Sequence, residues 1–136
     1  MKKIAGVDEV GRGSLIGPVY AAAVILNKSI NYKLLKDSKS LTKKKREIIA
    51  RHIKKNSVWA IGKASVKEIE NINILHASLL AMKRAVLKLK RKPSLVLIDG
   101  NKLPKMGNYN LKSIIKGDKK IYSISAASII AKVERD

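Results

Sequence analysis

Five short apolar segments along the chain predict β-strands. Residues 2–10 (KKIAGVDEV) are apolar and β-branched at their centre, and residues 19–27 (VYAAAVILN) form the continuous apolar run of a buried strand. Residues 57–66 (SVWAIGKASV) alternate between apolar and polar positions, which predicts a third strand. Residues 94–100 (SLVLIDG) and 111–118 (LKSIIKGD) predict two shorter strands.

The segments between these strands predict helices. Residues 43–56 (KKKREIIARHIKKN) follow two candidate capping residues, Ser40 and Thr42, and their apolar stripe would consist of Ile48, Ile49 and Ile53. Residues 67–92 have apolar side chains three or four positions apart, which predicts a long helix or two helices broken near Asn73. Residues 30–42 are expected to be connecting chain.

The last predicted helix covers residues 123–136 (SISAASIIAKVERD) and would begin near Ser123 or Ser125. Early strands that follow one another directly, combined with later strand–helix–strand units, indicate an α/β fold with one mixed sheet and helices packed against it. We expect residues 1–136 to form a single domain. No Gly, Asn or Pro closes the last helix, and we therefore expect a domain that is shortened at its C-terminal end.

Composition narrows the classes of protein that this chain can belong to. Apolar residues make up 46% of the sequence, which suits a globular protein, and the absence of Cys excludes disulfides and thiolate metal sites. The longest apolar run, VYAAAVIL, is shorter than the roughly 20 residues of a membrane span. We expect a soluble, cytoplasmic protein, with no membrane contact, that acts as a monomer.

Charge indicates the kind of partner. Thirty Lys and Arg residues against ten Asp and Glu residues give a formal net charge of +20, which favours a polyanion such as nucleic acid. A lysine-rich compositional bias is the alternative. It explains an excess of Lys over Arg but not the small number of acidic residues.

Four of these acidic residues lie where predicted strands end: Asp8, Glu9, Asp99 and Asp118. Because strand ends gather along one edge of an α/β sheet, these carboxylates can converge. Oxygen ligands of this kind suit Mg²⁺ or Mn²⁺, and a bound cation would offset the repulsion between Asp8 and Glu9. The alternative is that Asp99–Gly100 and Gly117–Asp118 are simple turns.

The segment GRGSLIG, residues 11–17, does not have the spacing of a dinucleotide-binding fingerprint, and a strand rather than a helix is predicted after it. Its glycines would let backbone N–H groups approach a sugar or phosphate. Arg12, held between two glycines, suits contact with the same groups.

Four blocks together closely resemble ribonuclease HII, the bacterial type 2 ribonuclease H: VDEVGRGSLIGPV, KDSKSLT, LIDGNKLP and IIKGDKKIYSISAASIIAKVERD. They occur in the family's order and extend over essentially the whole chain. Related type 3 enzymes usually lack the central Arg of the glycine block and carry an additional N-terminal domain. Arg12 and the short N-terminal segment therefore favour type 2.

The resemblance implies a ribonuclease H-like mixed β-sheet flanked by helices. It also implies an endoribonuclease that cleaves RNA in RNA–DNA hybrids and on the 5′ side of ribonucleotides in duplex DNA, leaving 3′-hydroxyl and 5′-phosphate ends. The implied metal ligands and catalytic residues, for two Mg²⁺ or Mn²⁺ ions, are Asp8, Glu9, Asp99 and Asp118. The implied substrate contacts are Gly11, Arg12 and Gly13 at the 2′-hydroxyl, and Ser38 and Lys39 at the nucleic-acid backbone.

The chain departs from the family pattern after Asp136. Family members continue through a Gly-Tyr segment whose tyrosine stacks beside the RNA–DNA junction, and no match to it occurs here. The rival interpretation is therefore a non-catalytic, basic nucleic-acid-binding fragment of the same fold.

Overall fold

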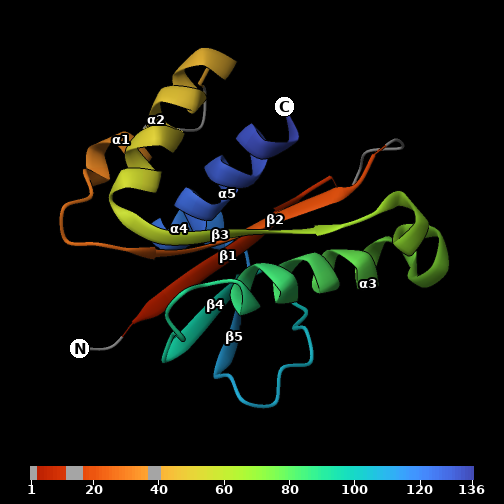
Figure 1. The fold of residues 1–136 in the computed structure, drawn as a ribbon. Helices are drawn as coiled ribbons and strands as arrows, with labels where there is room; N and C mark the ends of the chain where they lie inside the picture. Colours follow the sequence, from red (N-terminus) through yellow and green to blue (C-terminus); the bar gives the residue numbers. More distant parts are fainter. Residues whose placement is uncertain (1–2, 12–16, 37–40) are drawn as a thin grey trace.

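The computed structural model describes residues 3–11, 17–36 and 41–136. Within them the chain forms one β-sheet with helices on both faces (Figure 1). The strands are β1 (Ile4–Val10), β2 (Val19–Leu26), β3 (Ser57–Ala64), β4 (Leu95–Asp99) and β5 (Leu111–Ile114). The helices are α1 (Tyr32–Lys36), α2 (Lys43–Lys55), α3 (Val66–Leu87), α4 (Gly117–Lys120) and α5 (Tyr122–Arg135).

The sheet is mixed, as the sequence predicts, and its strand order is β3-β2-β1-β4-β5. β1 pairs antiparallel with β2, and β2 pairs antiparallel with β3. On its other side β1 pairs parallel with β4, which pairs parallel with β5. The carboxyl ends of β1, β4 and β5 therefore lie along the same edge of the sheet.

Alternate residues of the strands face the two helical layers. Val7 and Ala21 belong to a core cluster with α3, on the lower side of the sheet in Figure 1. Ala22 and Val24 belong to a second cluster with α2 and α5, on the upper side. The backbone of α5 lies so close to β1 that a Cβ atom on Gly6 would overlap the main chain of Ser123. The small residues of β1 and β2 thus let α5 approach the central strands closely.

The predicted long helix is broken where the sequence indicates. Asn73 has φ 68° and ψ 170° inside α3, a backbone conformation that residues other than glycine rarely adopt. Its side-chain oxygen accepts a hydrogen bond from the N–H of His76 at 3.0 Å, which starts the second half of the helix. Ser65 and Glu68 form a capping box at the first turn. No helix within the described ranges has the length and apolar character needed to cross a bilayer.

Two expectations for the α1 and α2 side of the sheet were incomplete or wrong. Thr42 caps α2 as predicted, and Ile49 and Ile53 are buried, but Ile48 is 50% exposed and does not belong to the buried stripe. α1 forms inside the segment that was expected to be connecting chain. α5 begins at Tyr122, next to Ser123 as expected, and no side chain caps its first turn.

Candidate active site

Asp8 and Asp99 lie beside each other at the carboxyl ends of two neighbouring parallel strands. Val7 of β1 is the register partner of Ile98 of β4, so the residues that follow them, Asp8 and Asp99, are adjacent. Their carboxyl groups are close enough to share a hydrogen bond. The structure thus brings together two of the four acidic residues that the sequence selects.

Asp8 is the only buried acidic residue in the part of the chain that the structure describes, with 7% of its surface exposed. Burial holds its pKa well above the usual value, and the negative charges of Asp99 and Glu9 and the hydrogen bond with Asp99 raise the pKa further. The N–H of Glu9 donates a hydrogen bond to Asp8 Oδ1 at 2.8 Å, which acts in the opposite direction. Negative charge at this position is therefore costly unless a cation or proton accompanies it.

Asp99 is oriented by the first turn of α4. Its Oδ1 accepts hydrogen bonds from the N–H groups of Gly117, at 2.6 Å, and Asp118, at 3.3 Å. A Cβ atom on Gly117 would lie 2.6 Å from Ile124 Cδ1 and 3.2 Å from Asp99 Oδ1, so a larger residue here would force Ile124 and Asp99 to shift. From the sequence Gly117 is expected only as part of a strand end or turn, and its contact with Asp99 is not predicted. The Gly-Asp dipeptide directly after an apolar strand was the available signal.

Asp118 lies on α4, not at the end of a strand as expected. β5 ends at Ile114, and Lys116, with φ 54°, turns the chain into α4. Asp118 is half-buried and lines a hollow of about 250 Å³ between α2, α4 and α5. The other residues around this hollow are Arg46, Lys119, Ser125, Ser128, Ile129 and Lys132.

Arg46 is the residue of α2 in this hollow, and it is held by two oxygen atoms. Its Nη1 donates a hydrogen bond to the carbonyl oxygen of Leu41 at 3.0 Å, and its Nη2 lies 3.3 Å from Asp136 Oδ2. Together with Lys119 and Lys132 it places three cationic side chains around Asp118. This grouping was not predicted from sequence, because the three residues lie on three different helices.

Glu9 is placed differently from the other three acidic residues. It follows Asp8 in an extended strand, so its side chain leaves β1 on the face that α3 covers, whereas Asp8 lies on the face of α5. Across the described ranges, no three Asp, Glu or His side chains are grouped so that they could hold a metal ion. The Asp8–Asp99 pair nevertheless fits a divalent cation, because it offers carboxylate oxygens and its charges repel each other.

Of the predicted substrate contacts, only Gly11 lies within the described residues. It has φ 116°, a conformation that favours glycine, and a Cβ atom there would lie 3.1 Å from the carbonyl oxygen of Pro18. Arg12, Gly13, Ser38 and Lys39 lie outside the described residues.

Comparisons with known proteins agree with this architecture. The family model for ribonuclease HII matches residues 5–136. The chain is 79% identical to ribonuclease HII of Pelagibacter ubique (strain HTCC1062) over 136 residues, which are 100% of this chain and 73% of that protein.

Two solved structures share the fold. The crystal structure of ribonuclease H2 from Pyrococcus horikoshii OT3 has a TM-score of 0.83 and 28% identity, covering 98% of this chain and 72% of that chain. Bst-RNase HIII in complex with Mn²⁺ has a TM-score of 0.73 and 21% identity, covering 98% and 51% respectively. The mixed sheet is therefore of the ribonuclease H type, as the resemblance implied. The chain belongs to the ribonuclease HII family of ribonuclease H endonucleases.

Proposed function

We propose that this chain hydrolyses the phosphodiester bond on the 5′ side of a ribonucleotide embedded in duplex DNA, and cleaves the RNA of RNA–DNA hybrids, leaving 3′-hydroxyl and 5′-phosphate ends. The observation that carries the proposal is the Asp8–Asp99 pair at the end of two parallel strands. Membership of the ribonuclease HII family supports it independently.

The carboxylates would act as ligands of two Mg²⁺ or Mn²⁺ ions. Asp8 and Asp99 would anchor the ions, and Glu9 and Asp118 would complete the ligand set. Bound divalent ions lower the pKa of an attacking water and stabilise charge on the leaving oxygen. The protein contributes the fixed position of Asp99, which the N–H groups of Gly117 and Asp118 orient.

The cationic side chains around Asp118 would hold a phosphate of the nucleic-acid strand that is cleaved. Arg46, Lys119 and Lys132 surround the hollow beside this residue, and Ser125 and Ser128 add hydroxyl donors. Gly11, Arg12 and Gly13 would contact the 2′-hydroxyl, and Ser38 and Lys39 the backbone. The charge of +20 also supports the rival function, which is binding of nucleic acid without cleavage.

The deciding experiment is incubation of the protein with a DNA duplex that contains one ribonucleotide, in Mg²⁺, in Mn²⁺ and in chelator. The all-DNA duplex of the same sequence and the Asp8→Asn variant are the controls. Metal-dependent nicking on the 5′ side of the ribonucleotide supports the enzyme. Binding of the duplex without nicking in either metal supports the rival function.

A further inference from the structure

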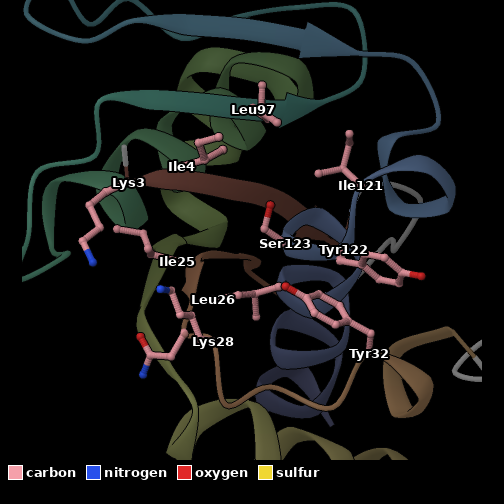
Figure 2. Close-up of a pocket in the computed structure, with 11 residues that line it drawn as sticks. Lys3, Ile4, Ile25, Leu26, Lys28, Tyr32, Leu97, Ile121, Tyr122 and Ser123 are labelled. Carbon is pink, nitrogen blue, oxygen red and sulfur yellow. The ribbon is translucent and has the colours of Figure 1, made fainter. Parts of the chain in front are cut away.

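A hollow of about 620 Å³ lies on the face of the sheet that α5 covers, toward the amino end of β1 (Figure 2). α5 begins at Tyr122 and leaves this end of the face open. Ile4, Leu26 and Leu97 supply apolar surface from three strands, while Tyr32 and Tyr122 lie on the side opposite Lys3 in Figure 2. The hollow therefore combines an apolar floor, an aromatic wall and a cationic rim.

The two tyrosines form an exposed aromatic pair. Their ring centroids are 4.7 Å apart with an angle of 53° between the planes, and the residues are 47% and 44% exposed. Neither ring belongs to the two core clusters of the described residues. Exposed apolar surface with a polar rim is typical of an interaction site, and the outer faces of these rings add to such a surface beside the hollow.

The hollow connects with the candidate active site along α4. A third hollow, of about 310 Å³, shares Ile121 and Tyr122 with the large one and shares Asp118, Lys119 and Ser125 with the hollow around Arg46. Tyr122 follows Asp118 by only four residues, so their Cα atoms are at most about 14 Å apart. That upper limit corresponds to at most about four nucleotides of one strand at about 3.4 Å per nucleotide.

The charge around the hollow favours nucleic acid. Lys3 and Lys28 line it, and α4 adds Lys119 and Lys120 where it continues toward Asp118. No acidic residue is found among the described residues that line the large hollow. Aromatic rings for the bases, combined with lysines for the backbone, are the usual arrangement for binding single-stranded nucleic acid.

We propose that Tyr32 and Tyr122 form a stacking site for an unpaired nucleobase of the substrate strand, within about four nucleotides of the candidate active site, with Lys3 and Lys28 contacting the adjacent phosphates. This proposal rests on the proposed function, since it assumes that the strand passes Asp118. It predicts that the protein binds a duplex with a single-stranded extension more tightly than a blunt duplex.

The test measures the affinity for a hybrid duplex with and without a four-nucleotide unpaired extension at either end, by fluorescence anisotropy in the absence of divalent metal. One stacked base is expected to increase the affinity about 5- to 150-fold. The double variant Tyr32→Leu/Tyr122→Leu should lose this gain relative to its own affinity for the blunt duplex. Tyr32→Phe/Tyr122→Phe keeps both rings and should retain the gain, as should Tyr20→Leu on β2.

A fluorescent base analogue in the extension provides a second measurement, because stacking on tyrosine quenches it in the wild type and not in the leucine double variant. The proposal is overturned if the extension adds no affinity, or if the leucine double variant keeps the full gain. It is equally overturned if the two tyrosines bind an acidic, apolar peptide while the unpaired extension adds no affinity, because the hollow would then be a site for protein and not for a nucleobase. Nicking without a gain from the extension overturns only the stacking site, whereas a gain without nicking overturns only the proposed enzymatic function.

Discussion

The main-chain N–H of Gly117 donates a hydrogen bond of 2.6 Å to the side chain of Asp99, which fixes the end of β4 against the start of α4. Gly117→Ala would place a methyl group against Ile124 and Asp99 Oδ1. We expect a loss of about 1–3 kcal/mol in the free energy of unfolding. We also expect cleavage to fall about 100-fold, because a displacement of about 1 Å has that effect on a positioned group.

Chemical denaturation and single-turnover cleavage measure the two effects of Gly117→Ala. Gly107→Ala is the matched control, since a Cβ atom at Gly107 meets nothing within 4 Å. Equal behaviour of the two variants would show that the contact between Gly117 and Asp99 does not matter.

Asp8→Asn separates binding from catalysis. Removal of this charge should reduce cleavage by more than about 100-fold, the scale for losing one electrostatic group of an active site. Binding of the duplex should be retained or strengthened, because one repulsion of phosphate disappears. Cleavage at the normal rate would exclude Asp8 as a metal ligand.

The same variant should alter stability in a pH-dependent manner. Because the pKa of Asp8 is raised in the folded protein, the folded state binds a proton more tightly than the unfolded state, and the stability of the metal-free wild type falls as pH rises above the ordinary Asp value of about 3.9. Asp8→Asn removes this loss. In chelator it should be more stable than the wild type at pH 7, and the difference should shrink at pH 4. Urea unfolding at both pH values is the measurement.

Glu68 has the opposite pH dependence. Its hydrogen bond with Arg84 is the main cause that lowers its pKa to about 2, and the atoms of the ion pair are 2.6 Å apart. The pair therefore stabilises the folded state above pH 4.5, and this contribution is lost as pH falls toward 2. Glu68→Gln keeps an acceptor for the N–H of Ser65 but loses the charge. It should destabilise α3 at pH 6 more than at pH 3, and a pH-independent difference would contradict this role.

Lys119 should contribute to binding of the phosphate backbone. Lys119→Gln is expected to reduce the slope of log affinity against log salt by about 0.9, the value for one phosphate contact in a duplex. Lys105→Gln removes one exposed charge beside α3, on the other side of the sheet, and should leave the slope unchanged. Equal changes in both variants would mean that only the total charge matters.

The two neighbouring isoleucines of α2 illustrate how far a hydrophobic pattern predicts packing. Ile48 and Ile49 were assigned to the same apolar stripe, yet Ile49 is 7% exposed and Ile48 is 50% exposed. A helical pattern defines a face to within about one residue, and the helix that packs against it decides where the buried surface ends. The five strands could be predicted because apolar runs and Gly or Pro boundaries are local signals.

The positions of Asp118 and Tyr122 could not be predicted in the same way. Lys116 adopts a left-handed conformation that nothing in the sequence indicates, and it converts the expected strand end into α4. α5 starts without a capping side chain, because packing against β1 rather than a local signal determines its position. The sequence predicts that carboxylates at the strand ends converge, but it does not predict that Asp8 and Asp99 are neighbours, because strand order does not follow from a single sequence.

The strand order has a consequence for partly folded forms of the protein. β1, β2 and β3 form two successive antiparallel pairings, whereas the pairing of Ile4 with Leu95 joins segments that are far apart in the sequence, with β2, β3, α1, α2 and α3 between them. The conformational entropy lost on closing a loop grows with the length of the loop, and the connections that close the β1–β2 and β2–β3 pairings are shorter than the one between β1 and β4. A form that keeps the first three strands but releases β4 retains three of the five strands and has no carboxylate pair. The candidate active site therefore exists only when β4 is paired with β1. Phosphodiester cleavage would be lost as soon as β4 is released, while most of the helical structure is still present.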